Sequence, residues 1–395
     1  MIINNAYSPQ DLLLYLNYNQ DFGCFSVGLE NGFRIFNCDP VKEKMRKEFE
    51  DGGGIGLVEM LFRCNYLGLV GGGRNPKFPP NKVIIWDDLK GKPVVELEFR
   101  SVVRNVKLRR DRIVAILSNK VFVYTFGASP QKLFTLETYN NDKGLVAVST
   151  SNHSAVMAIP GRQKGVVQIV NLNTAGHPTS FSLSEPYPAS NPVITLISAH
   201  TTQLSFIALN AEGTRLATAS EKGTLVRVFE TSNGRLLHEL RRGVDRADIF
   251  SISFNSNSTR LCVSSDKGTV HIFNLDGDAS HDVPFSDEQS MASSFNSSLS
   301  NQDHSLSSSI GNRHSSFSFM KDLLPKYFSS QWSFAHFRVN NEVKCICAFS
   351  PEHDSNQLTV LCADGGYYKV CFDPIKGGEC ERISYRKFLS DLSND

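Results

Sequence analysis

Two segments of the chain follow the same plan: LSFIALNAEGTRLATASEKGTLVRVF at residues 204–229 and IFSISFNSNSTRLCVSSDKGTVHIF at residues 249–273. Each reads as a β-strand, a polar turn, the triplet Thr-Arg-Leu, a second strand, a Ser-x-Lys-Gly-Thr turn and a third strand. The two copies start about 45 residues apart, which is the repeat length of a β-propeller blade. The repeat therefore predicts an all-β protein built from blades.

Weaker copies of the pattern run along the whole chain, and at residues 81–88 Trp86 and Asp87 end a strand as in WD repeats. Seven units are predicted, near residues 20–50, 57–99, 102–138, 144–183, 204–241, 249–337 and 343–389. Seven units of four antiparallel strands close into one seven-bladed β-propeller over residues 1–395. A double β-sandwich is the alternative, but it does not explain the period. The first and last units each hold four strands, so we expect no strand exchange where the ring closes.

A long segment at residues 276–331 interrupts the sixth unit between its third and fourth strands. It is rich in Ser, Asn and Asp and has no β pattern, which predicts a partly disordered loop. Apolar residues recur within it, among them Phe285, Phe295 and Leu306.

The composition limits the classes of function. The chain has 395 residues, 41% of them hydrophobic, and a net charge of +1, so any anion binding must be local. The apolar run Leu12–Leu16 is far too short to span a membrane. Nine cysteines without metal-ligand spacing indicate reduced, buried thiols. No nucleophile–base set, nucleotide loop or metal motif is visible, so we expect no enzyme activity, no cofactor, no metal and no nucleic-acid partner.

Arg241 and Arg242 are adjacent at the end of the predicted outer strand of blade five. Consecutive strand residues point to opposite sides, so one side chain should reach toward the blade five side and the other toward blade six. The neighbouring turns add hydroxyl groups, glycine N–H groups and cationic side chains. Arginine binds phosphate monoesters through a bidentate fork. This pattern predicts two anion sites that share one strand, although tight hairpins and surface ion pairs alone would also explain it.

A second Arg-Arg pair lies in KLRRDR at residues 107–112, in the predicted turn between the first two strands of blade three. No Ser/Thr-rich turn follows it. We interpret it as a solvated turn, with a protein-binding edge as the alternative.

The motif ELRRG at residues 239–243, with NQDFGCFSVGLENGFRIFNCDP (19–40) and PPNKVIIWDDLK (79–90), resembles the PROPPIN family over nearly the whole chain. Leu240 suggests the subgroup that contains the Hsv-two, WIPI-three and WIPI-four proteins. The resemblance implies a seven-bladed propeller that binds phosphatidylinositol 3-phosphate and phosphatidylinositol 3,5-bisphosphate.

The resemblance also assigns two lipid sites. The first is expected to use Ser220, Thr224, Arg227 and Arg241, with His200. The second is expected to use Arg242, Ser265, Thr269 and His271, with Arg246 and Lys267. Family members insert the long blade-six loop into the bilayer, and the segment 276–331 matches that loop by position. An unstructured spacer is the alternative for this segment.

The implied protein is a phosphoinositide effector of autophagy or microautophagy that recruits partners. It is expected to be cytoplasmic and peripheral on pre-autophagosomal, endosomal or vacuolar membranes, and a monomer in solution. The implied partner is an autophagy lipid-transfer protein, bound through loops near residues 74–82 and 104–112. The alternative is a WD-repeat scaffold that binds only proteins.

Overall fold

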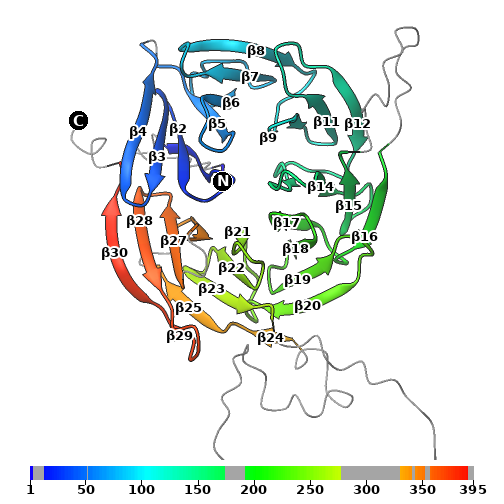
Figure 1. Cartoon of the computed structure of the whole chain (residues 1–395), viewed down its shortest axis with the longest axis vertical. Coiled ribbons are helices and arrows are strands. Elements are labelled where there is room, and N and C mark those ends of the chain that lie inside the picture. Colours follow the sequence, from blue (N-terminus) through cyan, green and yellow to red (C-terminus); the bar gives the residue numbers. More distant parts are fainter. Residues whose placement is uncertain are drawn as a thin grey trace, which may run out of the picture.

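The computed structural model describes residues 1–2, 13–50, 52–173, 192–276, 330–339, 343–351 and 356–389. Within these ranges the protein consists of strands in seven sheets, which Figure 1 shows arranged as blades around a central axis. Each sheet contains four antiparallel strands that follow one another outward in chain order. This confirms the predicted seven-bladed β-propeller and excludes the double sandwich. The described part of the chain contains no helix that could cross a membrane.

The first four blades are regular meanders. Blade one consists of β1 (Leu13–Tyr18), β2 (Cys24–Leu29), β3 (Gly32–Cys38) and β4 (Val41–Glu48). Blade two consists of β5 (Ile55–Met60), β6 (Tyr66–Gly71), β7 (Lys82–Asp87) and β8 (Lys92–Glu98). Blade three consists of β9 (Asn105–Arg109), β10 (Arg112–Ile116), β11 (Lys120–Thr125) and β12 (Lys132–Glu137). Blade four consists of β13 (Ala147–Val148), β14 (Val156–Pro160), β15 (Val166–Asn171) and β16 (Ile194–Ser198).

Blades five and six each carry a fifth, parallel strand on the outer edge. Blade five consists of β17 (Leu204–Leu209), β18 (Arg215–Ser220), β19 (Leu225–Glu230) and β20 (Leu236–Arg241), followed by β24 (Gln331–Trp332). Blade six consists of β21 (Ile249–Phe254), β22 (Arg260–Ser265), β23 (Thr269–Asn274) and β25 (Ala335–Arg338), followed by β29 (Gly378–Glu379). Blade seven consists of β26 (Cys345–Phe349), β27 (Gln357–Cys362), β28 (Gly366–Cys371) and β30 (Glu381–Lys387).

Two predicted blade limits are wrong. Blade one begins with β1 at Leu13, before the predicted start at 20. This inner strand, LLYLNY, is buried along most of its length and therefore lacks the polar–apolar alternation by which a half-buried strand is recognised. Blade four ends with β16, beyond the predicted end at 183. Residues 172–193 separate β15 from β16, so the fixed repeat length placed this blade's outer strand too early.

The insert at 276–331 enters between β23 and β25, the third and fourth strands of blade six, as predicted. Most of it, residues 277–329, lies outside the described residues, so its disorder and its insertion into a bilayer stay predictions. The end of the insert is described: Leu240 and Arg241 of β20 pair with Gln331 and Trp332 of β24. The insert therefore returns along blade five before it completes blade six.

The ring closes by packing between blades one and seven, since each of these blades is complete in itself. Phe25 of β2 stacks on Phe36 of β3 and meets the ring of Phe388, which follows β30, at a centroid distance of 5.0 Å. The Tyr367 hydroxyl of blade seven donates a hydrogen bond of 2.6 Å to the Cys38 carbonyl of blade one. The expectation of no strand exchange is confirmed.

The arginines of the two Thr-Arg-Leu triplets join neighbouring blades. Arg215 of blade five donates to the Ser258 carbonyl of blade six at 2.6 Å. Arg260 of blade six donates to the Asn356 side chain of blade seven at 2.8 Å, and its guanidinium lies over the Phe372 ring. The repeated triplet is therefore explained by contacts between successive blades.

All nine cysteines are free thiols, and seven are buried, as predicted; Cys64 is exposed and Cys371 is partly buried.

The interpretation of KLRRDR as a solvated turn is wrong for two of its arginines. Arg109 donates to the carbonyls of Ser149, Ser151 and Ser154 in blade four at 2.9, 2.9 and 2.7 Å. Arg112 is buried and donates to the Leu172 carbonyl. Only Arg110 is exposed.

Replacing Arg109 by alanine is expected to lower the free energy of unfolding by about 2–3 kcal/mol, because three partly buried carbonyls lose a charged donor. Chemical denaturation measures the loss. Arg110→Ala is the matched control: it removes an exposed arginine that contacts the Asn152 side chain and the Phe62 ring, and should cost less than about 1 kcal/mol. Equal losses of unfolding free energy in the two variants would contradict the conclusion that Arg109 holds blades three and four together.

Candidate functional site

Arg241 and Arg242 leave the end of β20 in opposite directions, as predicted. Leu240, the residue before them, packs in a core cluster shared with blade six. Arg241 lies on the other face of the sheet, the face whose Phe229 packs against blade four. The sequence predicted that the Arg241 side chain points to the blade five side. In the structure it lies on the face of blade five that packs against blade four. Both arginines are largely buried, with 8% and 6% exposure.

The first candidate site lies beside Arg241. Arg227 of β19 is paired in register with Glu239 of β20, and its guanidinium contacts the Glu239 carboxylate at 2.9 Å. The remaining nitrogen of Arg227 donates to the Ala199 carbonyl at 2.7 Å. Arg241 donates to the Ser330 hydroxyl at 3.4 Å, and that hydroxyl donates to Glu239 at 3.1 Å. Two guanidinium groups and one carboxylate thus share one small volume.

His200 joins this site from the connection between β16 and β17. Its Nε2 lies 3.0 Å from the Thr218 hydroxyl. Burial, and to a smaller extent the charge of Arg227, lowers the pKa of His200 to about 4. The imidazole is therefore neutral at pH 7 and can accept or donate a hydrogen bond without adding charge.

The second candidate site lies on the blade six side of the same loop. Arg242 donates through Nε to the Gly223 carbonyl at 3.0 Å and through a terminal nitrogen to the Asp245 carbonyl. Burial lowers the pKa of Arg242, although it remains cationic at pH 7. Nearby, His271 of β23 lies 3.3 Å from the Ser333 hydroxyl. Burial, then the charge of Arg242, lowers the pKa of His271 to about 4.

The four predicted hydroxyl residues occupy the two hairpin turns that border these sites. Ser220 and Ser265 end β18 and β22 and are both buried; the Ser265 hydroxyl accepts the Lys267 N–H at 3.4 Å. Thr224 is half-buried, and its carbonyl accepts the Arg242 N–H at 2.9 Å. Thr269 begins β23 and is also half-buried.

The turns on both sides of Gly243 form one continuous surface. Ala247 donates to the Lys222 carbonyl at 3.1 Å, and Asp266 donates to the Asp248 carbonyl at 3.0 Å. Gly223 has φ of 62°, and a Cβ there would lie 1.8 Å from the Ala247 carbonyl oxygen, so this close approach requires glycine. The side chains exposed on this surface are Lys222, Val244, Asp245, Arg246, Asp248 and Lys267.

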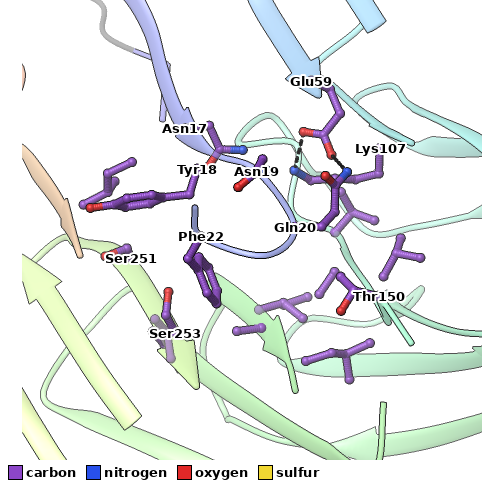
Figure 2. A pocket seen from close by; sticks show the side chains of 18 of the residues that line it. Asn17, Tyr18, Asn19, Gln20, Phe22, Glu59, Lys107, Thr150, Ser251 and Ser253 are labelled. Atoms are coloured by element: carbon purple, nitrogen blue, oxygen red, sulfur yellow. Dashed lines mark hydrogen bonds and ion pairs between the residues drawn. The ribbon is translucent and has the colours of Figure 1, made fainter. Parts of the chain in front are cut away.

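A hollow of about 550 Å³ in the central channel is the other candidate. Figure 2 shows Gln20, Glu59 and Lys107 from three different blades meeting at its wall. Lys107 contacts Glu59 at 2.8 Å, and Gln20 donates to the Leu108 carbonyl and accepts from the Phe62 N–H. These polar groups satisfy one another and join blades one, two and three, which accounts for them without a ligand. Within the described residues, neither this hollow nor any other place holds a cluster of side chains suited to bind a metal ion.

Comparison with known proteins agrees with this architecture. The family model for PROPPIN matches residues 12–389. The chain is a member of the PROPPIN family. PROPPINs are phosphoinositide-binding β-propellers of autophagy and are typically binding proteins without enzymatic activity.

Relatives match nearly the whole length of this PROPPIN. It is similar to SVP1-like protein 2 of Pichia angusta, with 35% identity over 93% of this chain and 92% of the relative. Among solved structures it resembles Kluyveromyces lactis Hsv2, with 23% identity, a TM-score of 0.67 and coverage of 95% and 98%. It also resembles KlAtg21 in a complex with the coiled-coil of AgAtg16, with 22% identity, a TM-score of 0.64 and coverage of 95% and 99%.

Sequence reasoning did not find all residues of the two candidate sites. Glu239 is two residues before Arg241 on one strand, so strand alternation alone was a sufficient signal for it. Ser330, just before β24, comes close to Arg241, and Ser333, just after β24, comes close to His271. His336 lies opposite His271 in the pairing of β23 with β25. No sequence pattern shows these contacts, because a long insert separates the paired strands.

The two histidines predict a pH dependence of stability. In the unfolded chain each binds a proton below about pH 6.5, whereas in the folded PROPPIN each does so only below about 4. The stability that the two neutral histidines contribute is therefore fully present above pH 6.5. It is lost as the pH falls toward 4, because the unfolded chain then binds protons that the folded protein does not. Replacing both His200 and His271 by glutamine should flatten the fall in the unfolding free energy between pH 7 and 4. An unchanged slope in chemical denaturation would contradict these pKa shifts.

Proposed function

We propose that this PROPPIN binds phosphatidylinositol 3-phosphate and phosphatidylinositol 3,5-bisphosphate at membranes, through the two sites on either side of Leu240-Arg241-Arg242-Gly243. The observation that carries the proposal is the pair of adjacent, largely buried arginines that diverge into two separate polar clusters. Burying two guanidinium groups is costly unless an anion or strong acceptor compensates them. A buried bidentate donor is also suited to a phosphate monoester.

The surface between the two sites supports contact with a membrane. Val244, an apolar side chain, is 61% exposed at the tip of the loop that separates the sites. Exposed Arg246 lies on the same loop, and exposed Lys222 and Lys267 lie on the neighbouring turns, so three basic side chains stand beside the two exposed acids Asp245 and Asp248. Basic side chains are attracted to anionic headgroups, and an apolar tip favours the interface. Both headgroup sites would then face one bilayer, with the insert at 276–331 as an additional anchor.

The protein would act in autophagy or microautophagy as a monomer that is cytoplasmic and peripheral on pre-autophagosomal, endosomal or vacuolar membranes. It would recruit partner proteins, including an autophagy lipid-transfer protein. The β6–β7 connection at 74–82 offers a protein contact, with Arg74 and Lys77 exposed. The second proposed region, 104–112, is mostly strand β9, so only its turn with exposed Arg110 remains as a contact.

Vesicle co-flotation tests the lipid function. The vesicles contain no phosphoinositide, phosphatidylinositol 3-phosphate, the 3,5-bisphosphate or the 4,5-bisphosphate. We expect flotation only with the two 3-phosphorylated lipids. Equal or absent binding throughout would reject the lipid function and leave the WD-repeat scaffold that binds only proteins.

A further inference from the structure

The first site contains an acidic side chain that already holds its arginines. Both Nε and one terminal nitrogen of Arg227 lie 2.9 Å from the same Glu239 oxygen, Oε2. The third nitrogen of Arg227 donates to the Ala199 carbonyl. The other Glu239 oxygen, Oε1, accepts the Ser330 hydroxyl, which in turn accepts a hydrogen bond from Arg241. One carboxylate therefore connects the two guanidinium groups between which a phosphate would bind.

The equivalent position of the second site is not acidic. In blade five, the register places Arg227 opposite Glu239. In blade six, the same position pair is occupied by His271 and His336. The donors of Arg242 are held by the neutral carbonyls of Gly223 and Asp245. Among the described residues, Asp245 and Asp266 act on Arg242 through their charge but form no ion pair with it. The two sites thus differ by one built-in carboxylate.

We propose that Glu239 is a specificity-determining residue that restricts the first site to phosphate monoesters; this inference rests on the proposed lipid function. A ligand must replace Glu239 as the partner of Arg227. A phosphodiester headgroup or a carboxylate carries one negative charge, the same as Glu239. Replacing Glu239 by such a ligand at Arg227 therefore gains little binding free energy. A phosphate monoester carries about 1.5 to 2 negative charges and three acceptor oxygens, so it can contact Arg227 and Arg241 together. Discrimination arises because the weaker anion meets a competing charge.

The test uses the full chain with Glu239→Gln, which keeps the shape and the acceptor for Ser330 but removes the charge. Flotation is measured with phosphatidylcholine vesicles that contain phosphatidylserine, phosphatidylinositol or phosphatidylinositol 3-phosphate at equal mole fraction. We expect the weak residual binding to the first two lipids to rise on the order of fivefold, the effect of releasing one partly exposed ion pair. Binding to the 3-phosphate should change less than about twofold, because the monoester displaces the carboxylate in either protein.

Two further variants make the outcome decisive. Glu230→Gln removes one negative charge from the opposite end of the same strand pair, where Glu230 contacts Arg235. An equal gain in this control would attribute the effect to net charge and overturn the inference. His336→Glu introduces a carboxylate at the equivalent position of the second site and should weaken binding to phosphatidylserine and phosphatidylinositol more than binding to the 3-phosphate. A larger loss for the 3-phosphate would overturn the inference.

The failure of this inference differs from failure of the proposed function. Wild-type binding to the 3-phosphate, with unchanged lipid selectivity in Glu239→Gln, would overturn only the role of Glu239. Loss of 3-phosphate binding in Glu239→Gln would also overturn it, since Glu239 would then support the ligand-binding geometry of Arg227. Absence of 3-phosphate binding by the wild type would overturn the lipid function itself.

Discussion

Replacing Arg241 and Arg242 together by threonine is expected to reduce binding to vesicles with phosphatidylinositol 3-phosphate by more than about 100-fold. Each headgroup site alone is expected to be worth roughly 6 kcal/mol, a dissociation constant of tens of micromolar. Two sites on one rigid propeller bind the same bilayer in tandem, which raises the apparent affinity by about 10²-fold or more. Each single variant removes one site and hence this gain, and the double variant removes both sites.

The control for the double variant is Arg162→Thr with Arg235→Thr. Both arginines are mainly exposed, at 73% and 67%, and their replacement changes the net charge by the same amount. Vesicle flotation compares the two proteins, and thermal unfolding confirms that both are folded. Undiminished flotation of the Arg241/Arg242 variant would reject the two-site hypothesis. An equal loss in the control would show that binding depends on overall charge.

Phe25→Ala is expected to lower the free energy of unfolding by about 3–5 kcal/mol, the cost of removing a buried phenylalanine. Phe25 is fully buried where blades one and seven meet, within reach of Phe36, Tyr367 and Phe388. Within the described residues, these two blades share no strand. A cavity at this point therefore weakens the closure of the whole ring, and chemical denaturation measures the effect.

Tyr139→Ala provides the comparison for this stability prediction. Tyr139 is 39% exposed, so its removal leaves no closed cavity and should cost less than about 1 kcal/mol. A similar cost for the two variants would mean that side-chain packing at the blade one–blade seven contact is not what closes the propeller.

Much of the fold was predictable because a propeller repeats its local pattern. The Thr-Arg-Leu triplet and the Ser-x-Lys-Gly-Thr turn, present twice at one spacing, indicate the period, and the period indicates the ring. Blades one and four were the exceptions. β1 is buried on both faces and shows no alternation, and residues 172–193 interrupt the period before β16.

The site was predictable in its central feature. Two adjacent residues on a strand must point apart, so ELRRG alone indicated that Arg241 and Arg242 serve two different places. KLRRDR contains the same Arg-Arg pair in a different environment. Arg109 meets three carbonyls of blade four there, and no sequence pattern shows which carbonyls a neighbouring blade will present.

The sequence by itself determined the all-β architecture, the number of blades and the divergence of the two arginines, because these follow from local periodicity and strand geometry. Only the tertiary structure decided what surrounds each arginine. Glu239 and Ser330 meet at Arg241, and His271 meets His336, through strands that a long insert separates. The physical reason is that strand register across an insert is set by packing of distant segments, and the charge balance of a buried site depends on those distant partners.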